Sequence, residues 1–168
     1  IVKQNNGFIN VYSEVGKGTT FKIYLPFVGV RAGEVLYSEV QIPLRGGTET
    51  ILLAEDNEII RVLNRNVLQE FGYTVIEAID GEEALQEFQE HRDRISLLIL
   101  DVIMPKKSGR EVFEEARRNN PNVKVLFTSG YPSDLIQKEG VLESGLHFLS
   151  KPSSPQALLR TIREVLDQ

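Results

Sequence analysis

The pattern of hydrophobic and polar residues changes character near residue 49 of this chain. From there to the C-terminus, short apolar runs alternate with segments in which apolar residues recur every three or four positions. Such runs are typical of buried strands, and such spacing is typical of amphipathic helices. The strands predicted in this way are residues 51–54, 73–78, 97–100, 123–127 and 147–150.

These strands and the helical segments between them predict an α/β fold. Five strand–helix units with short connections favour a five-stranded parallel sheet with helices on both faces, in the flavodoxin-like order 2-1-3-4-5. The fourth helix should be short or broken, because Pro132, Gly140 and Gly145 fall within it. The first helix should bury a stripe made of Ile60, Leu63, Val67 and Phe71, widened by Ile59 and Leu68.

The first 48 residues follow a different pattern. Residues 8–12 and 20–25 are rich in β-branched and aromatic residues and predict a β-hairpin with one apolar face. An isolated hairpin is marginal in water, so its partner layer belongs to another part of a larger protein. Residues 27–48 show no sustained period and contain several glycines, as expected of a linker.

Composition narrows the class of protein. The net charge of -5 argues against nucleic acid as a partner, because phosphate binding needs a concentrated basic surface. The absence of cysteine excludes disulfides and thiolate metal sites and fits the cytoplasm. No apolar segment is long enough to span a membrane, so we expect no direct membrane contact here, and anchoring of a parent protein stays open. Ile1 is not an initiator residue, so we expect a fragment of a longer protein.

Polar residues stand at the carboxyl ends of the predicted strands. Glu55 and Asp56 follow the first strand, Asp101 the third, Thr128 the fourth and Lys151 the fifth. Taken singly, each has an ordinary explanation: a helix cap, a surface lysine, a strand-forming threonine. In a parallel sheet, however, all these ends converge on one edge. Three carboxylates so close repel one another, so Mg²⁺, Lys151 or both must compensate their charge, as in a phosphoryl-transfer site.

Four segments at these strand ends resemble the signatures of response-regulator receiver domains: AEDN (54–57), LILDVIMP (98–105), LFTSG (126–130) and FLSKP (148–152). The resemblance covers residues 49–168 and implies specific roles. Asp101 would accept a phosphoryl group from a phosphohistidine, and Thr128 and Lys151 would hold the phosphoryl oxygens. Asp56, Asp101 and the Ile103 carbonyl would bind Mg²⁺, and Glu55 would assist through water.

The same resemblance places an aromatic switch residue at Phe148 and a cis peptide at Lys151–Pro152. Two features depart from the best-known receivers. Phe148 lacks the hydroxyl of the usual tyrosine, and the segment from Gly140 to Gly145 is weak for a fourth helix that signals. His91 lies in a charged run and His147 at a strand start, so neither is expected to be a phosphodonor.

The N-terminal segments IVKQNNGFINVYSE and GKGTTFKIYLP (16–26) resemble the closing hairpin of the ATP-binding domain of sensor histidine kinases. The resemblance divides the chain into a remnant of that domain (1–26), a linker (27–48) and a complete receiver (49–168). The family's asparagine-bearing helix, DxGxG segment and nucleotide lid are missing from these residues, so we expect no bound nucleotide cofactor. Gly16 and Gly18 are interpreted as turn residues rather than as a phosphate site.

The function predicted from these features is two-component signal transduction by the receiver of a hybrid histidine kinase. The partner would be a phosphohistidine dimerisation domain in cis or a histidine phosphotransfer protein. The kinase core is lacking, but the receiver would catalyse its own aspartyl phosphorylation. Aspartyl phosphatases require a second aspartate where this chain has Ile103, a pseudo-receiver would lack one of the site residues, and no DNA-binding module follows the last helix.

Overall fold

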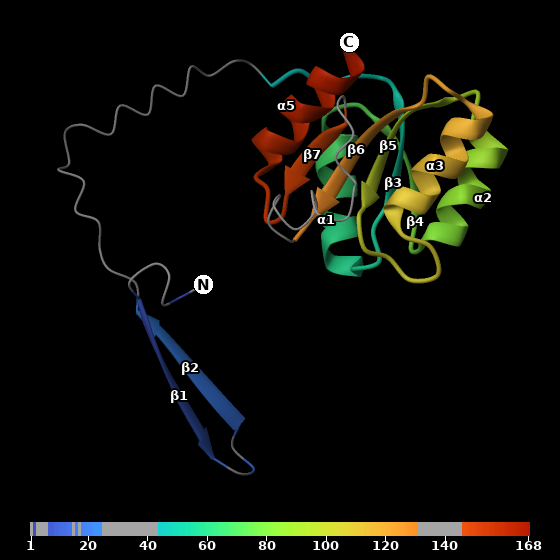
Figure 1. The fold of residues 1–168 in the computed structure, drawn as a ribbon. Helices are drawn as coiled ribbons and strands as arrows, with labels where there is room; N and C mark the ends of the chain where they lie inside the picture. Colours follow the sequence, from blue (N-terminus) through green and yellow to red (C-terminus); the bar gives the residue numbers. More distant parts are fainter. Residues whose placement is uncertain (1, 3–6, 15, 17, 25–43, 131–145) are drawn as a thin grey trace. The chain divides into compact units, whose positions relative to one another are not determined.

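The computed structural model describes the chain except for residues 1, 3–6, 15, 17, 25–43 and 131–145 (Figure 1). The chain is divided into two compact units, Ile1–Ile42 and Pro43–Gln168. The predicted linker falls largely in the residues left out, as does the segment for which a short or broken fourth helix is predicted.

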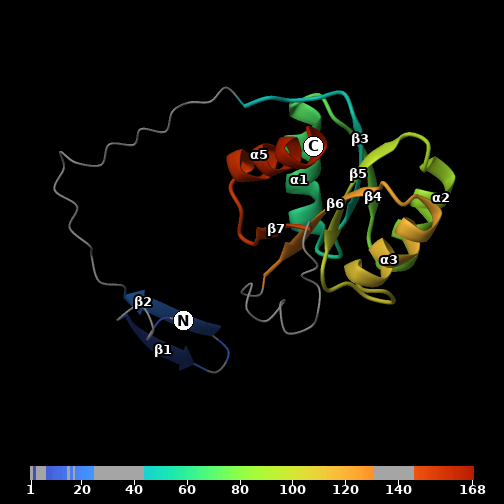
Figure 2. The ribbon, with the colours of Figure 1, turned by 45° about the horizontal axis from the view of Figure 1, so that its top comes forward.

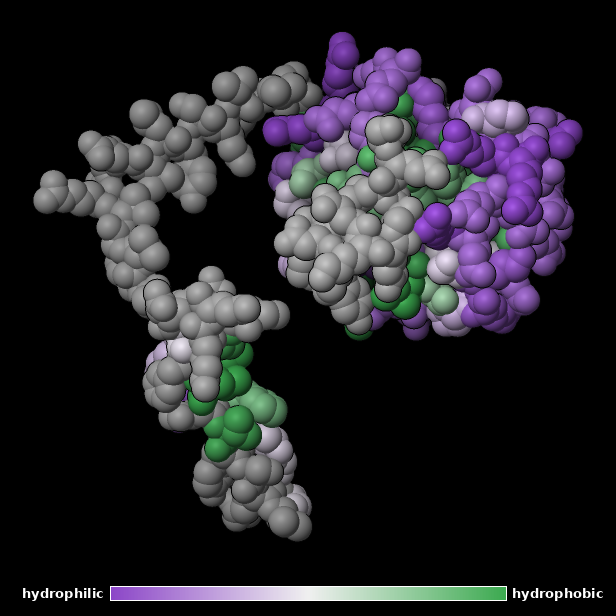
Figure 3. Space-filling view, in the orientation of Figure 1, coloured by the Kyte–Doolittle hydropathy of each residue, from purple (hydrophilic) through white to green (hydrophobic). Residues whose placement is uncertain are grey.

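The first unit contains the predicted hairpin. Strands β1 (Phe8–Glu14) and β2 (Gly18–Tyr24) pair antiparallel, with Val11 opposite Phe21. Gly16 and Gly18 have φ angles of 79° and 100°, which is the backbone conformation that the connecting turn needs and that side chains disfavour. Ile9, Val11, Phe21 and Ile23 are exposed, and Figure 3 shows hydrophobic side chains on the surface of this hairpin.

The second unit is a parallel five-stranded sheet. Its strands are β3 (Thr50–Ala54), β4 (Thr74–Ala78), β5 (Ile95–Asp101), β6 (Lys124–Ser129) and β7 (His147–Ser150). They lie in the order β4-β3-β5-β6-β7, all neighbours being parallel. Counted from the first strand of this unit, this is the order 2-1-3-4-5, so the predicted fold class and strand order are confirmed.

Helices cover both faces of this sheet (Figure 2). Helices α2 (Gly81–His91) and α3 (Gly109–Asn119) pack on one face, and α1 (Glu58–Glu70) and α5 (Pro155–Leu166) pack on the other. A polar side chain caps the first turn of each helix. Ser108 forms a capping box with Glu111 at the start of α3, and Ser154 caps α5 ahead of Pro155.

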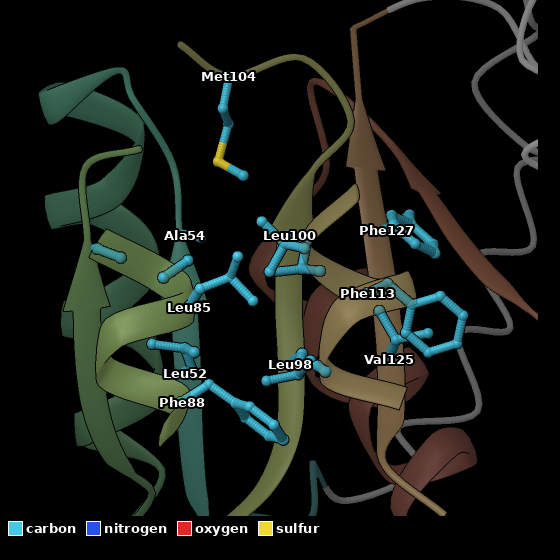
Figure 4. Packing of buried hydrophobic residues seen from close by; sticks show 14 of the residues in the cluster. Leu52, Ala54, Leu85, Phe88, Leu98, Leu100, Met104, Phe113, Val125 and Phe127 are labelled. Atoms are coloured by element: carbon cyan, nitrogen blue, oxygen red, sulfur yellow. The ribbon is translucent and has the colours of Figure 1, made fainter. Parts of the chain in front are cut away.

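The central strand β5 is buried on both faces. Leu98 and Leu100 pack with Leu85 and Phe88 of α2, as Figure 4 shows, while Leu97 and Ile99 point to the α1 and α5 side. Each such buried leucine stabilises the fold by roughly 1.5–3 kcal/mol relative to an exposed one. Asp101 therefore stands at the end of a strand that is buried on both faces of the sheet.

The predicted orientation of α1 is wrong in part. Leu68 is buried and Val67 and Phe71 are packed against the core, but Ile59 is 80% exposed and Leu63 is 58% exposed. The side of α1 that carries Arg61 and Arg65 faces β4, because both arginines pair with Glu77 of that strand, at 3.5 and 3.0 Å. These ion pairs turn the arginines toward the sheet and leave Ile59 and Leu63 in solvent.

Candidate functional site

The sheet brings the predicted site residues to its carboxyl edge. Asp101 on β5 lies in register with Thr128 on β6, so the two side chains share a face of neighbouring strands. Backbone hydrogen bonds extend the pairing past the strand ends: Glu55 N–H to the Ala78 carbonyl (3.1 Å), Val102 N–H to Thr128 (3.0 Å) and Lys151 N–H to Ser129 (2.7 Å). The backbone at each predicted position is thus held by the sheet itself.

Lys151 lies between two carboxylates. Its ammonium group donates hydrogen bonds to Glu55 Oε2 and to Asp101 Oδ2, the latter at 2.7 Å. The Lys151–Pro152 peptide is cis, as predicted. Only 2% of Glu55 is exposed, and Lys151 and Asp101 are largely covered as well. A buried ion pair of this kind needs both partners, because either charge left alone would be strongly unfavourable.

Burial raises the pKa of Glu55 above its ordinary value. The negative charge of Asp101 acts in the same direction, while the hydrogen bond and the charge of Lys151 oppose it. Three carboxylates, those of Glu55, Asp56 and Asp101, lie together beside the single ammonium group of Lys151. A further cation at this edge would offset part of their negative charge.

The carboxylates of Glu55, Asp56 and Asp101 could hold a metal ion together. One oxygen from each lies within 4.8 Å of the others, with Glu55 buried, Asp101 partly buried and Asp56 exposed. Oxygen-only ligands with access to water suit Mg²⁺, which keeps several of its waters when bound. The donor set of this chain therefore fits the predicted cofactor.

Two positions flank the site: Ile103, two residues after Asp101, and Gly130, two residues after Thr128. Ile103 donates its backbone N–H to Asp101 Oδ1 at 3.3 Å, and its side chain is 56% exposed. Gly130 is exposed, and a Cβ added there would meet no atom within 4 Å. Neither position offers a polar side chain near Asp101.

Phe148 is connected to the site through an aromatic neighbour. Its ring stacks on Phe127, with centroids 5.3 Å apart and planes inclined by 21°, and Phe127 contacts Phe113 edge-on at 5.7 Å. Because Phe127 directly precedes Thr128, the aromatic packing connects Phe148 to the site through one strand.

One residue that organises the acidic turn escaped the sequence analysis. Arg61 on α1 donates from Nη1 to the Glu55 backbone carbonyl at 2.8 Å. Its neighbour Asn57 caps the helix by accepting from the N–H groups of Ile59 and Ile60 at 3.0 and 3.2 Å. The spacing of four residues from Asn57 to Arg61 was the available signal, because it places Arg61 one helical turn above the cap.

A cavity of about 250 Å³ lies elsewhere, at the amino ends of β6 and β7. Phe113, Arg117, Lys124, His147 and Val165 are among the residues that line it. None of the carboxylates lines it, so the acidic edge and not this hollow is the candidate site. Among the helices that the structure describes, none is both long and apolar enough to cross a membrane.

Comparison with known proteins agrees with this geometry. The sequence model of the response regulator receiver domain matches residues 51–163. Sensor kinase CckA of Brucella abortus (strain 2308) is 38% identical over 175 residues, which cover 100% of this chain and 18% of that protein. This chain thus spans less than a fifth of that relative's length.

Two solved structures share the fold of the second unit. The receiver domain of the hybrid histidine kinase CckA has 37% identity and a TM-score of 0.60, covering 70% of this chain and 98% of that one. The chemotaxis protein CheY4 of Vibrio cholerae has 31% identity and a TM-score of 0.65, covering 71% of this chain and 100% of that one. Fold, acidic edge and sequence agree, and the chain belongs to the response regulator receiver domain family of two-component signal transduction.

Proposed function

We propose that Asp101 accepts a phosphoryl group from a phosphohistidine, within the phosphorelay of a hybrid histidine kinase. The observation that carries this proposal is the pairing of Asp101 with Lys151 at 2.7 Å beside two further carboxylates. A lone surface aspartate would need neither a buried lysine nor a buried glutamate beside it. A pseudo-receiver, the rival reading, has no use for this set of charges.

In the proposed reaction an Asp101 carboxylate oxygen attacks the phosphorus atom. The new O–P bond forms as the P–N bond to the imidazole breaks, and the electron pair of that bond stays on the ring nitrogen. The imidazole leaves neutral, with a proton taken up from solvent. Lys151 and the hydroxyl of Thr128 would then hold phosphoryl oxygens, since catalysis of this transfer consists mainly of positioning and charge stabilisation.

Mg²⁺ would be held by Asp56, Asp101 and the Ile103 backbone carbonyl, with Glu55 assisting. When bound, the ion would supply positive charge that offsets the charge of the carboxylates and of the incoming phosphoryl group. Glu55 also keeps Lys151 in place, because it accepts one of the ammonium hydrogen bonds. The chain's own residues thus set the direction from which the phosphoryl group approaches.

The phosphodonor would be the dimerisation domain of a kinase in cis or a histidine phosphotransfer protein. Three exposed apolar side chains near the acidic edge support a protein partner: Ile59 and Leu63, one turn apart on α1, and Ile103 in the loop after Asp101. An apolar strip beside the nucleophile suits the packing of a helix that carries the phosphohistidine. This reaction would take place in the cytoplasm.

We also propose the domain division 1–26, 27–48 and 49–168, with the first part closing a histidine-kinase ATP-binding domain. Its support is the alignment of the whole chain with sensor kinase CckA and the exposed apolar face of the hairpin. Phe148 would act as the switch residue, because Phe127, on which it stacks, adjoins Thr128. A shift of Thr128 toward a phosphoryl group would change that packing.

The test is incubation with acetyl phosphate or phosphoramidate, followed by intact-mass measurement with and without EDTA. The proposal expects one phosphoryl group per chain in the presence of Mg²⁺ and none with EDTA. An Asp101→Asn variant should stay unmodified. Equal labelling of that variant, or no labelling of the wild type, would reject the proposal.

A further inference from the structure

The loop that joins β5 to α3 contains a backbone conformation under strain. Lys106 has a φ of 65°, and it is the one non-glycine residue with positive φ in the part of the chain that the structure describes. Side chains disfavour this left-handed region, so a surrounding contact must hold Lys106 there. The loop also contains Ile103, whose carbonyl belongs to the proposed Mg²⁺ site.

Lys106 is held mainly by the buried carboxylate of Asp80, with the exposed Glu82 at 3.5 Å as a second partner. Its ammonium nitrogen lies 2.8 Å from Asp80 Oδ2, and the Asp80 side chain is only 9% exposed. The other oxygen of Asp80 caps α2 by accepting from the N–H groups of Glu82 and Glu83 at 2.9 and 3.0 Å. The hydrogen bond from Lys106, with these backbone bonds, lowers the pKa of Asp80. One carboxylate thus ties the loop to the first turn of α2.

Backbone contacts join the same two segments. Gly81 donates its N–H to the Pro105 carbonyl at 3.4 Å, and a Cβ at Gly81 would collide with the backbone of Lys107. Met104 is buried in the same core cluster as Leu85 of α2. The middle part of the loop therefore rests on α2, and the Lys106–Asp80 ion pair is the polar contact that holds it there.

We propose that Lys106 and Asp80 are positioning residues, which hold the loop so that the Ile103 carbonyl stands ready for Mg²⁺. This inference rests on the proposed function of the acidic edge. An ion pair on an open surface would contribute little, and Lys106 alone is 52% exposed. Here, however, its partner is buried and its own backbone is strained, so loss of the pair frees the loop to leave its position.

A pure charge effect and a positioning effect predict opposite changes in Mg²⁺ affinity for the Lys106→Met variant. Removing the positive charge of Lys106 near a cation site should strengthen Mg²⁺ binding if only charge matters. Removing the negative charge of Asp80 should weaken it. If the pair positions the loop, both Lys106→Met and Asp80→Asn weaken Mg²⁺ binding, although they change the net charge in opposite directions.

The variants leave the rest of the site intact. Asparagine at position 80 still caps a helix, so α2 keeps its first turn. Lys107→Met is the matched control, since Lys107 is the next residue but pairs with Glu115 of α3 at 2.6 Å. Lys106→Arg keeps the charge and should restore the pair. Circular dichroism melting confirms that each variant is folded.

The experiment is an NMR titration of the whole chain with MgCl₂, followed through amide shifts of residues 101–109. We expect Lys106→Met and Asp80→Asn each to weaken binding roughly tenfold, the lower end of the range for residues that support metal ligands. The double variant should be no weaker than either single one, Lys106→Arg should resemble the wild type, and Lys107→Met should bind as well or better. Tighter binding by Lys106→Met, or additive losses in the double variant, would overturn the inference.

Amide hydrogen exchange without Mg²⁺ separates this inference from the proposed function. Lys106→Met and Asp80→Asn should speed exchange in residues 102–107, while Lys107→Met should not. If the wild type binds no Mg²⁺ at all, the proposed function fails. Faster exchange in the two variants would still show that the Lys106–Asp80 pair holds the loop. Unchanged exchange in both variants would show that the pair does not hold the loop, whether or not the chain binds Mg²⁺.

Discussion

The ammonium nitrogen of Lys151 lies 2.7 Å from Oδ2 of Asp101, across 50 positions of sequence. The same lysine also bonds to the buried Glu55, so one cation serves two carboxylates. In this arrangement Asp101 keeps a positive partner close to the oxygen that would be phosphorylated.

Replacing Lys151 should impair phosphorylation, and it should also lower the melting temperature, because Glu55 and Asp101 lose their cationic partner. In Lys151→Met the phosphoryl oxygens lose their cationic partner, and we expect uptake from acetyl phosphate to slow roughly 100-fold, as when one stabilising donor is removed from an enzyme site. Stopped reactions analysed by intact mass give the rate. Lys107→Met changes the charge equally outside the site and should react at the wild-type rate, whereas wild-type uptake by Lys151→Met would contradict the role.

The raised pKa of Glu55 predicts a pH dependence of stability. A group whose folded-state pKa exceeds its unfolded-state value stabilises the fold below the unfolded value, and that stability is lost as pH rises through the folded value. Without Mg²⁺, ionised Glu55 should therefore lower the free energy of unfolding at neutral pH. We expect Glu55→Gln to melt at a higher temperature than the wild type at pH 7, because the variant no longer buries a charge there.

That gain should shrink as the pH is lowered toward the ordinary pKa of a glutamate, because wild-type Glu55 then becomes neutral. Thermal melts in EDTA from pH 4.5 to 8 measure it, with the exposed Glu58→Gln on α1 as control. A lower melting temperature for Glu55→Gln at pH 7, or a gain that grows at low pH, would show that the buried charge does not oppose folding.

Ile103 and Gly130 predict a long-lived phosphoryl group. Neither side chain can orient a water for attack on phosphorus, and each roughly 1.4 kcal/mol of lost positioning slows hydrolysis tenfold. Decay of the phosphorylated chain should accelerate about tenfold in Ile103→Asn, and Gly130→Glu has open space for its side chain. Loss of the group from the wild type within seconds, or no change in either variant, would rule this out.

The exposed residues of α1 should matter for a protein donor and not for a small one. Ile59→Glu and Leu63→Glu place charges on the apolar strip, so we expect transfer from a phosphorylated histidine domain to fall about tenfold while uptake from acetyl phosphate is unchanged. Ile79→Glu, at an exposed isoleucine before α2, is the matched control. Equal loss with both donors would mean that the strip affects the site itself rather than docking.

The strand order and the convergence of charges could be inferred from the sequence because local features determine them. The run from Leu97 to Leu100 ends abruptly at Asp101, and parallel strands must align their ends. The orientation of α1 could not be inferred in this way. Periodicity placed Leu63 inward, but Glu77 on a separate strand attracts Arg61 and Arg65 and turns the helix.

The Lys106–Asp80 pair was out of reach for a related reason. Nothing in the sequence marks Lys106 as left-handed, and nothing near Asp80 predicts that its side chain meets the loop after β5. The pair forms because the loop after β5 rests on α2, two elements whose contact depends on the whole fold. Contacts of this kind need three-dimensional coordinates, whereas strand ends and caps follow from spacing.

The central claim is that Asp101 carries the phosphoryl group, and its most direct test is to locate that group. Borohydride converts an aspartyl phosphate to homoserine, which peptide mass spectrometry then assigns to one position in the chain. After phosphorylation with Mg²⁺, we predict homoserine at position 101 and at no other acid, with none formed in EDTA. Homoserine at position 56, the longer alcohol 2-amino-5-hydroxyvaleric acid at the glutamate of position 55, or no homoserine at 101, would contradict the account.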